Sequence, residues 1–229
     1  MSARQTDLES CPVGVEDCIW LTELAALRSE NDALRSQVIR DPLTGLHNYQ
    51  FFEENLDAEM QRTLRTGRPT CLVIIDLDFF KRVNDERGHE AGNAALRTAA
   101  AVFRGELRQI DIVCRYGGEE FTVILPQTNL PVAVNVAERL RVALESTAVE
   151  FQGDRFQITA SFGLAIYQPG SDMDAKSLVD QADQFMYQAK QQGRNQVCYP
   201  DLASLKPRTE VSSEERSALF GQPGGDPED

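Results

Sequence analysis

Between residues 41 and 199, short apolar runs alternate with stretches in which apolar residues recur every three or four positions. The first pattern is typical of strands and the second of amphipathic helices. The run CLVIID at 71–76 predicts a buried strand, and IVCRY at 112–116 followed by EEFTVILP at 119–126 predicts a hairpin. Helices are predicted over 48–66, 79–86, 90–107, 131–147 and 175–191, with further strands around 149–166 and at 196–199. Helices that interrupt a mostly antiparallel sheet predict an α+β sandwich.

The hairpin turn is predicted from two glycines, Gly117 and Gly118, which stand between its two apolar runs. A two-residue type I′ turn needs a positive φ at both central residues, and glycine supplies this without steric cost. We therefore expect both glycines to lie in the turn with positive φ.

The first 40 residues are polar apart from one helical stripe. Its members, spaced alternately four and three apart, are Trp20, Leu24, Leu27, Asn31, Leu34 and Val38. This is heptad spacing, and a single Asn at an a position favours two parallel strands. The flanking acids (Glu23, Glu30) and bases (Arg28, Arg35) attract one another only in a parallel pair. We expect residues 1–40 to form a parallel homodimeric coiled coil; the alternative is an amphipathic helix packed on its own domain.

Three heptads are marginal as an isolated coiled coil, so the globular domains should contribute to association. Because this segment is also polar at its centre, at Asn31, we hypothesise that it receives a regulatory protein partner that changes its pairing.

The composition of the chain argues against some classes of function. The chain has 229 residues, with 23 Lys and Arg against 36 Asp and Glu, for a net charge of −13. Such a balance argues against binding to nucleic acid phosphates. No apolar run reaches the roughly 18 residues that span a bilayer, and five scattered cysteines suggest reduced thiols in the cytoplasm. Residues 200–229, rich in Pro, Gly, Ser and acids, are predicted to be a disordered acidic tail.

Two groups of acids fall at neighbouring strand ends. Asp76 ends the first predicted strand, and Glu119 and Glu120 begin the second strand of the hairpin. Carboxylates with substrate phosphates are the usual ligands of Mg²⁺, although either acid alone would more often be simply solvated.

Groups that could bind phosphate lie nearby in this scheme. Phe79, Phe80 and Lys81 open a helix whose free N–H groups could receive phosphate oxygens. Lys190 and Arg194 bracket a later helix end, where such bases often merely complement the helix dipole.

Beyond these patterns, RYGGEEF at 115–121 resembles the signature of the GGDEF family, the diguanylate cyclases, in its Glu-for-Asp form. The similarity extends in order over about 41–199. Its other blocks are DPLTGLHN at 41–48, DLDFFK at 76–81, Asn84-Asp85, Gly88-His89, Ser161-Phe162-Gly163, Ala182-Asp183, YQAK at 187–190 and Gly193-Arg194-Asn195.

The resemblance implies a fold related to nucleotide cyclases and polymerase palm domains, and a reaction joining two GTP molecules into cyclic di-GMP with release of two pyrophosphates. It implies two Mg²⁺ (or Mn²⁺) ions per active site, held by Asp76, Glu119 and the carbonyl of Leu77. Phe79, Phe80, Lys81, Lys190 and Arg194 would bind the triphosphate. Asn84 and Asn93 would read guanine, with His89 nearby. Glu119, or failing it Glu120, would accept the proton of the attacking hydroxyl.

Each domain would bind one GTP, so two domains must face one another, and a parallel coiled coil would raise their effective concentration. One position departs from the family pattern, because Asn93 stands where Asp is usual. An amide has a single oxygen acceptor for the two donors on the guanine edge, so weaker GTP binding is expected.

A second site is implied by Arg108 and Asp111, which resemble the RxxD site where the product binds and inhibits, with Arg139 at a supporting position. Arginine suits phosphates and guanine edges because it donates bidentately.

Two other functions stay open from the sequence. One is a catalytically silent relative that binds GTP or cyclic di-GMP as an effector. The other is a dimeric scaffold that engages a protein partner. The acids and bases named above favour the enzyme, since silent relatives typically lose one of them.

Overall fold

The structure is a computed structural model that describes residues 23–24, 26–27 and 39–201. Its helices are α2 (Tyr49–Thr66), α3 (Phe80–Arg87), α4 (His89–Glu106), α5 (Leu130–Ser146) and α6 (Ala175–Gln191). Its strands are β1 (Thr70–Leu77), β2 (Ile112–Gly117), β3 (Glu120–Leu125), β4 (Val149–Phe151), β5 (Asp154–Phe156), β6 (Ala160–Tyr167) and β7 (Val197–Cys198).

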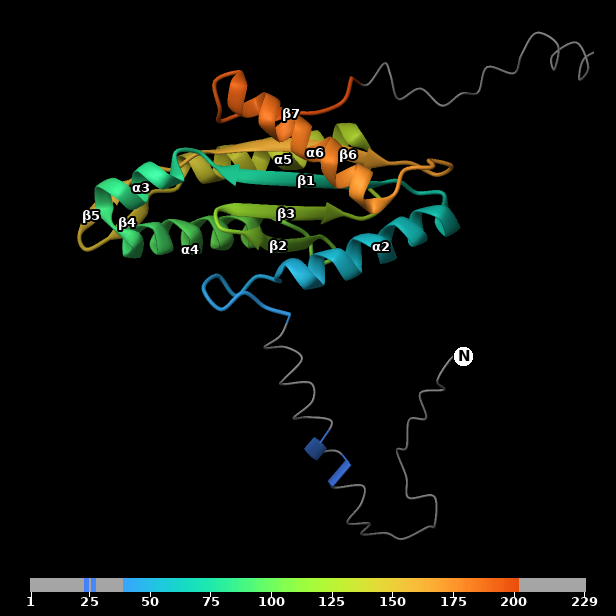
Figure 1. The fold of residues 1–229 in the computed structure, drawn as a ribbon, viewed down its shortest axis with the longest axis horizontal. Coiled ribbons are helices and arrows are strands. Elements are labelled where there is room, and N and C mark those ends of the chain that lie inside the picture. Colours follow the sequence, from blue (N-terminus) through green and yellow to red (C-terminus); the bar gives the residue numbers. More distant parts are fainter. Residues whose placement is uncertain (1–22, 25, 28–38, 202–229) are drawn as a thin grey trace, which may run out of the picture. The chain divides into compact units, whose positions relative to one another are not determined.

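One five-stranded sheet organises the domain, in the order β2-β3-β1-β6-β7 (Figure 1). All neighbours are antiparallel except β6 and β7. Strand β1 is central, and all eight of its residues are buried, which explains why its sequence is continuously apolar rather than alternating. The predicted α+β sandwich on a mostly antiparallel sheet is therefore confirmed.

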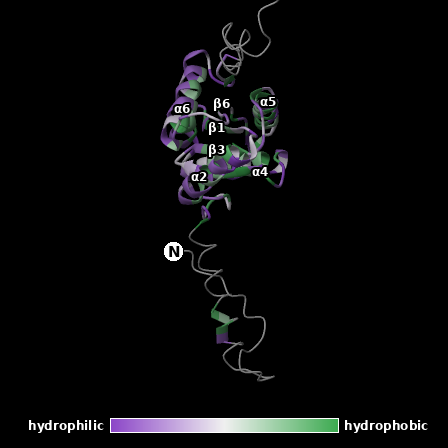
Figure 2. Ribbon diagram, turned by 90° about the vertical axis from the view of Figure 1, so that its right-hand side faces the viewer, coloured by the Kyte–Doolittle hydropathy of each residue, from purple (hydrophilic) through white to green (hydrophobic). Residues whose placement is uncertain are grey.

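The sheet lies between two layers of helices. Figure 2 shows α2 and α6 on one side and α4 and α5 on the other. The side with α2 and α6 holds a cluster of buried residues that includes Phe52, Leu56, Leu72, Leu178 and Met186. On the other side, the ring of Phe103 from α4 packs edge-on against Phe121 and Phe162 of the sheet. Helices α2, α4, α5 and α6 thus each turn an apolar face toward the sheet.

Local sequence signals set the helix ends. Asn48, Asn129 and Asp174 accept hydrogen bonds from backbone N–H groups in the first turns of α2, α5 and α6, as capping residues do. Gly67 ends α2 with φ of 70°, a conformation that favours glycine.

Gly163 controls how closely α6 approaches β6. A Cβ at this position would lie 2.1 Å from both the carbonyl oxygen of Ala182 and the backbone nitrogen of Met186. Only glycine permits this backbone contact, which brings the middle of α6 against the sheet.

The prediction of the turn was wrong in its details. Gly117 belongs to β2 and pairs with Glu120, and an irregularity between Arg115 and Gly117 shifts the register. The turn therefore contains Gly118 and Glu119, and of the two glycines only Gly118 has a positive φ, of 42°. A bulge adds a residue to one strand, so the glycine pair alone could not reveal the register.

The predicted coiled coil lies mostly outside the described residues, including Trp20, Asn31, Leu34 and Val38. Residues 23–24 and 26–27 are helical. The predicted tail is also outside, apart from residues 200 and 201. Within the described ranges, no helix is both long enough and apolar enough to cross a membrane.

Candidate active site

The acids predicted from the sequence meet at one end of the sheet, where β1 finishes. Asp76 pairs with Glu120 across β1 and β3 and is only 7% exposed. The Nζ of Lys190, which arrives from the end of α6, lies 2.8 Å from Oδ2 of Asp76. The structure thus brings Asp76, Glu120 and Lys190 together, although they belong to three different elements.

Glu119 lies in the turn beside this pair. Its carbonyl accepts a hydrogen bond of 3.3 Å from the N–H of Leu77, which ties the turn to the end of β1. The Asp76 charge acts on the Glu119 carboxylate, so Glu119 belongs to the same cluster.

Arg115 links the turn at Gly118 and Glu119 to Asp41 through hydrogen bonds. Its Nη1 donates to both carboxylate oxygens of Asp41, at 3.2 and 3.0 Å, and its Nε and Nη2 donate to the carbonyl of Gly118, at 3.1 and 2.7 Å. Thr44 also donates to Asp41, through its N–H and its hydroxyl. Asp41 and Arg115 lie in sequence blocks that resemble the family, but the sequence alone predicts a role for neither. The structure shows them fixing the turn that carries Glu119.

The cluster has more acids than bases, because Asp76, Glu119 and Glu120 lie near a single lysine, Lys190. Burial raises the pKa of Asp76, Glu119 and Glu120, and repulsion from Asp76 raises the last two further. Lys190 opposes these shifts without cancelling them. Asp183 of α6 adds to the repulsion, a contribution that could have been found from its place in α6, seven residues before Lys190 on the same helix face.

Half-buried carboxylates with raised pKa fit a hard divalent cation, which favours their charged forms. In the part of the chain that the structure describes, no three His, Cys, Asp or Glu side chains gather as a ready-made metal centre. A cation here would therefore complete its ligands with a backbone carbonyl, water or substrate oxygens, as Mg²⁺ commonly does.

The predicted phosphate-binding end of α3 opens in an unusual conformation. Phe79 precedes α3 with φ of 55° and ψ of 25°, and no side chain caps the helix. The first N–H groups of α3 have no partner within the helix, so those of Phe80 and Lys81 are free of intrahelical bonds. The ring of Phe79 is 60% exposed, and the guanidinium carbon of Arg194 lies 4.4 Å from its centroid. Arg194 is thereby held at the entrance to α3.

The residues predicted to read guanine lie where α3 and α4 meet. A Cβ on Gly92 would lie 2.0 Å from Oδ1 of Asn84, so the Asn84 side chain rests against α4 at Gly92, the residue before Asn93. Nδ2 of Asn93 donates weakly to Glu90, at 3.4 Å. His89 is the first residue of α4 and is exposed.

The predicted inhibitory residues also gather, after the end of α4. The N–H of Arg108 donates to Oδ2 of Asp111, at 3.0 Å, while Oδ1 of Asp111 is buried without a hydrogen bond. Arg139 of α5 lies 3.1 Å from Glu106. Burial raises the pKa of Asp111, and the charges of Arg108 and Arg139 oppose this, so the three side chains share one neighbourhood.

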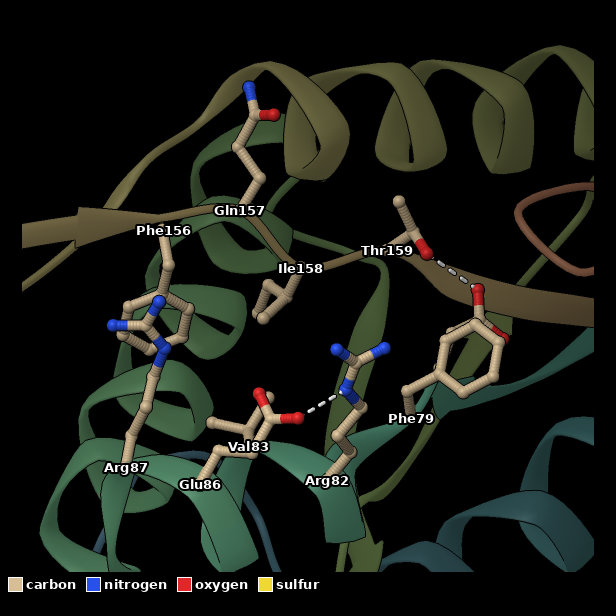
Figure 3. A pocket seen from close by; sticks show the side chains of 10 residues that line it. Phe79, Arg82, Val83, Glu86, Arg87, Phe156, Gln157, Ile158 and Thr159 are labelled. Atoms are coloured by element: carbon tan, nitrogen blue, oxygen red, sulfur yellow. Dashed lines mark hydrogen bonds and ion pairs between the residues drawn. The ribbon is translucent and has the colours of Figure 1, made fainter.

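Two cavities lie near these elements. One, of about 270 Å³, opens between α3 and the segment from Phe156 to Thr159, and Phe79 and Arg82 reach into its lining (Figure 3). The other, of about 500 Å³, lies between α2 and α6 and is lined by Tyr49, Tyr116 and Lys176 among others.

Comparison with known proteins agrees with this geometry. The family model described as "Diguanylate cyclase, GGDEF domain" matches residues 38–196. The chain is 38% identical over 172 residues to diguanylate cyclase DgcP of Pseudomonas aeruginosa, and 37% identical over 172 residues to the response regulator PleD of Caulobacter vibrioides. These alignments cover 75% of this chain but only 25% of DgcP and 38% of PleD. The chain therefore spans well under half the length of these curated relatives.

Two solved structures are also similar. The coiled coil and GGDEF domain of DgcB from Caulobacter crescentus, in complex with c-di-GMP, has a TM-score of 0.74 at 30% identity, covering 79% of this chain and 95% of that one. Diguanylate cyclase SiaD in complex with its activator SiaC, from P. aeruginosa, has a TM-score of 0.71 at 37% identity, covering 80% and 69%. Since the family model spans most of the sequence and the acids, the turn and the bases meet at one sheet edge, the chain belongs to the GGDEF family.

Proposed function

We propose that this protein is a diguanylate cyclase, which condenses two GTP molecules into cyclic di-GMP and two pyrophosphates. One observation carries the proposal: buried Asp76 and half-buried Glu119 and Glu120, all with raised pKa, lie near a single lysine at the end of β1, in a domain of the GGDEF family. The excess of negative charge suits a site that binds cations together with a triphosphate.

In this mechanism each residue has a simple task. Asp76, Glu119 and the carbonyl of Leu77 would hold two Mg²⁺ or Mn²⁺ ions, which supply Lewis acidity to the reacting phosphate. Lys190, Arg194 and the N–H groups of Phe79 and Phe80 bind the triphosphate, with Lys81 alongside. Asn84 and Asn93, with His89 close by, receive the guanine.

The bonds exchanged are two phosphoanhydrides for two phosphodiesters. In each half-reaction a 3′-oxygen bonds to the α-phosphorus of the other GTP, the bond from that phosphorus to the bridging oxygen breaks, and pyrophosphate leaves. Glu119 accepts the proton of the hydroxyl, with Glu120 as the second candidate, because an ionised carboxylate is a suitable proton acceptor.

Two copies of the domain must present their nucleotides to one another, because each holds one GTP. We infer a homodimer joined through a parallel coiled coil in residues 1–40. This segment could also receive an activating protein, and the similar structure of SiaD contains such an activator, SiaC. The domain limits that go with this proposal are 1–40, 41–199 and 200–229. Use of cellular GTP would place the domain in the cytoplasm.

The test is direct. Purified protein is incubated with GTP and Mg²⁺, and the nucleotides are separated by chromatography. We expect cyclic di-GMP, no product from Glu119→Gln, and full activity from Glu54→Gln, an exposed acid on α2. Rate per protein should rise with protein concentration if two chains must meet. If GTP is untouched while cyclic di-GMP binds, the protein is an effector and the proposal is wrong.

We further propose that cyclic di-GMP inhibits at Arg108, Asp111 and Arg139. The support is their common neighbourhood and the buried unpaired oxygen of Asp111. Arg108→Ala should raise the inhibition constant for cyclic di-GMP at least about tenfold, the effect of losing a charge-assisted hydrogen bond, and leave the initial rate unchanged. Arg104→Ala, in the last turn of α4, is the control. Undiminished inhibition of Arg108→Ala would contradict the proposal.

A further inference from the structure

Asp78 is a buried acid that the proposed mechanism does not use. It follows Asp76 by two residues and is 5% exposed. Its carboxylate accepts three hydrogen bonds from distant parts of the chain. The Ser161 hydroxyl donates to Oδ1 at 2.7 Å, and the Thr159 hydroxyl (Figure 3) and the Asn195 N–H donate to Oδ2 at 2.8 and 3.0 Å. Asp78 therefore joins the end of β1, the start of β6 and the loop after α6.

The bond to Asn195 fixes the loop that carries Arg194. Arg194 and Asn195 have φ of 66° and 45°, a left-handed conformation that residues other than glycine adopt at a cost in free energy. Something must therefore hold this loop. The N–H of Arg194 donates to the carbonyl of Ala189, at 2.9 Å, and the N–H of Asn195 donates to Asp78. The backbone around Arg194 is thus fastened on both sides.

The same carboxylate stands next to Phe79, which has the left-handed conformation that opens α3. The N–H of Asp78 donates to the carbonyl of Thr159, at 2.8 Å, so the backbone just before Phe79 is also fastened. The guanidinium of Arg194 lies over the ring of Phe79. Arg194 directly precedes Asn195, whose N–H binds the Asp78 carboxylate. Phe79 directly follows Asp78, whose own N–H is bonded to Thr159.

We propose that Asp78 is a positioning residue, which holds the loop after α6 so that Arg194 lies over Phe79 at the mouth of the triphosphate site. The proposal rests on the proposed function for the role of Arg194. Asp78 itself need not touch the nucleotide. It also gives a reason for Ser161 and Asn195, two residues of the sequence blocks that the mechanism leaves without a task.

Asparagine at this position separates geometry from charge. The Asn195 N–H is a fixed donor and needs an oxygen, whereas the Ser161 hydroxyl can rotate and accept instead of donate. In Asp78→Asn, the amide oxygen can take the place of Oδ2 while its NH₂ donates to Ser161. Asp78→Asn therefore keeps all three contacts without the negative charge, and Asp78→Ala removes them all.

The experiment measures kcat and KM for GTP with Mg²⁺ on the full chain. Asp78→Ala should displace Arg194 and so weaken its hydrogen bond to the triphosphate. Losing a hydrogen bond to a charged group should raise the KM at least about tenfold, with a smaller change in kcat. Asp78→Asn should stay within about threefold of the wild type, because it keeps the contacts. In the double variant Asp78→Ala/Arg194→Ala the KM should be no higher than in Arg194→Ala, because residues that act as a unit are not additive.

The matched control is Thr63→Val. It removes a buried hydrogen bond of 2.8 Å between Thr63 and Thr70, at the opposite end of β1. It should leave the KM unchanged and combine additively with Arg194→Ala. Additivity of Asp78→Ala with Arg194→Ala, or a Asp78→Asn variant as impaired as Asp78→Ala, would overturn the proposal, the second by showing that charge rather than position matters.

Hydrogen exchange supplies a readout that needs no activity. The amides of Arg194 and Asn195 should exchange faster in Asp78→Ala than in the wild type, and at the wild-type rate in Asp78→Asn and Thr63→Val. Unchanged exchange in Asp78→Ala would refute the hold on the loop, whatever the enzyme does. If the wild type neither binds nor converts GTP, the proposed function fails, and exchange still decides whether Asp78 fixes the loop.

Discussion

Two parts of this domain are built on opposite principles. Between α2, α6 and the sheet, Leu56, Leu178 and their neighbours are buried in a purely apolar cluster. At the end of β1, by contrast, Asp76, Glu119 and Glu120 share one nearby lysine, and Phe79 and Arg194 have left-handed backbones. The first region removes apolar surface from water, which stabilises the fold. The second gathers charge and strain, which cost stability.

The contrast explains how a site of this kind can persist. Left-handed residues and an excess of acids over bases persist only where the surrounding structure fixes them, and here the apolar layers supply that support. Stability and chemistry should therefore respond to different substitutions.

The largest effect on stability is expected from Leu56→Ala. Leu56 is 1% exposed in the apolar cluster, and such a truncation leaves a cavity that costs about 2–5 kcal/mol. Urea unfolding measures this. Leu64→Ala, on the same helix but 47% exposed, should cost less than about 0.5 kcal/mol. Turnover per folded molecule should match the wild type in both variants. A loss of turnover per folded molecule in Leu56→Ala alone would contradict the view that stability and chemistry depend on different regions.

The next effect is on chemistry alone. Asp76→Asn keeps the side-chain shape but removes the charge that holds cations in the proposed mechanism, so turnover should fall by about a hundredfold or more. The free energy of unfolding should change by less than about 1 kcal/mol, because the charge lost was itself penalised by burial. Asp57→Asn, an exposed acid on α2, should do neither. A variant at Asp76 that unfolds instead would make this acid part of the structural framework.

The smallest effect is on the pH dependence of stability. Burial and the Asp76 charge raise the pKa of Glu119 and Glu120. A carboxyl whose pKa is higher in the folded state stabilises the fold fully below its unfolded pKa, and that contribution disappears as the pH rises through the folded value. Glu119→Gln/Glu120→Gln should therefore gain stability relative to the wild type between about pH 4 and 7.

The gain should be under about 1 kcal/mol, because both groups are partly exposed and screened by solvent. Thermal melts at several pH values measure it, with Glu54→Gln as the control that should run parallel to the wild type. If the double variant instead loses stability relative to the wild type as the pH rises, the pKa of these two acids is not raised in the folded protein, and this prediction is wrong.

The sequence predicts most of the elements because their signals are local. The continuous run at β1 and the periodic stretch at α6 depend on neighbours along the chain, and the structure places α6 at the predicted 175–191. The turn was misplaced by one residue because a bulge in β2 depends on its pairing with β3. Pattern alone carries no register across strands.

The contacts that hold the candidate site in place could not be predicted from the sequence, for a related reason. Arg115 reaches Asp41 across 74 positions, and Asp78 receives Asn195 across 117. Each of these residues looks like an ordinary surface or turn residue in its own segment. Their pairing exists only in three dimensions, so motif blocks show that they matter without showing what they touch.

The loop that reaches Asp78 comes after almost all of the domain has been made. A growing chain that ends after β3 already contains every acid of the cluster, but lacks Lys190 of α6 and Asn195 beyond it. Contacts between residues this far apart in the sequence close long loops, which costs conformational entropy. An unfinished chain on the ribosome therefore carries these acids without Lys190. Under the proposed mechanism, a complete triphosphate site exists only once α6 and the loop after it have been synthesised.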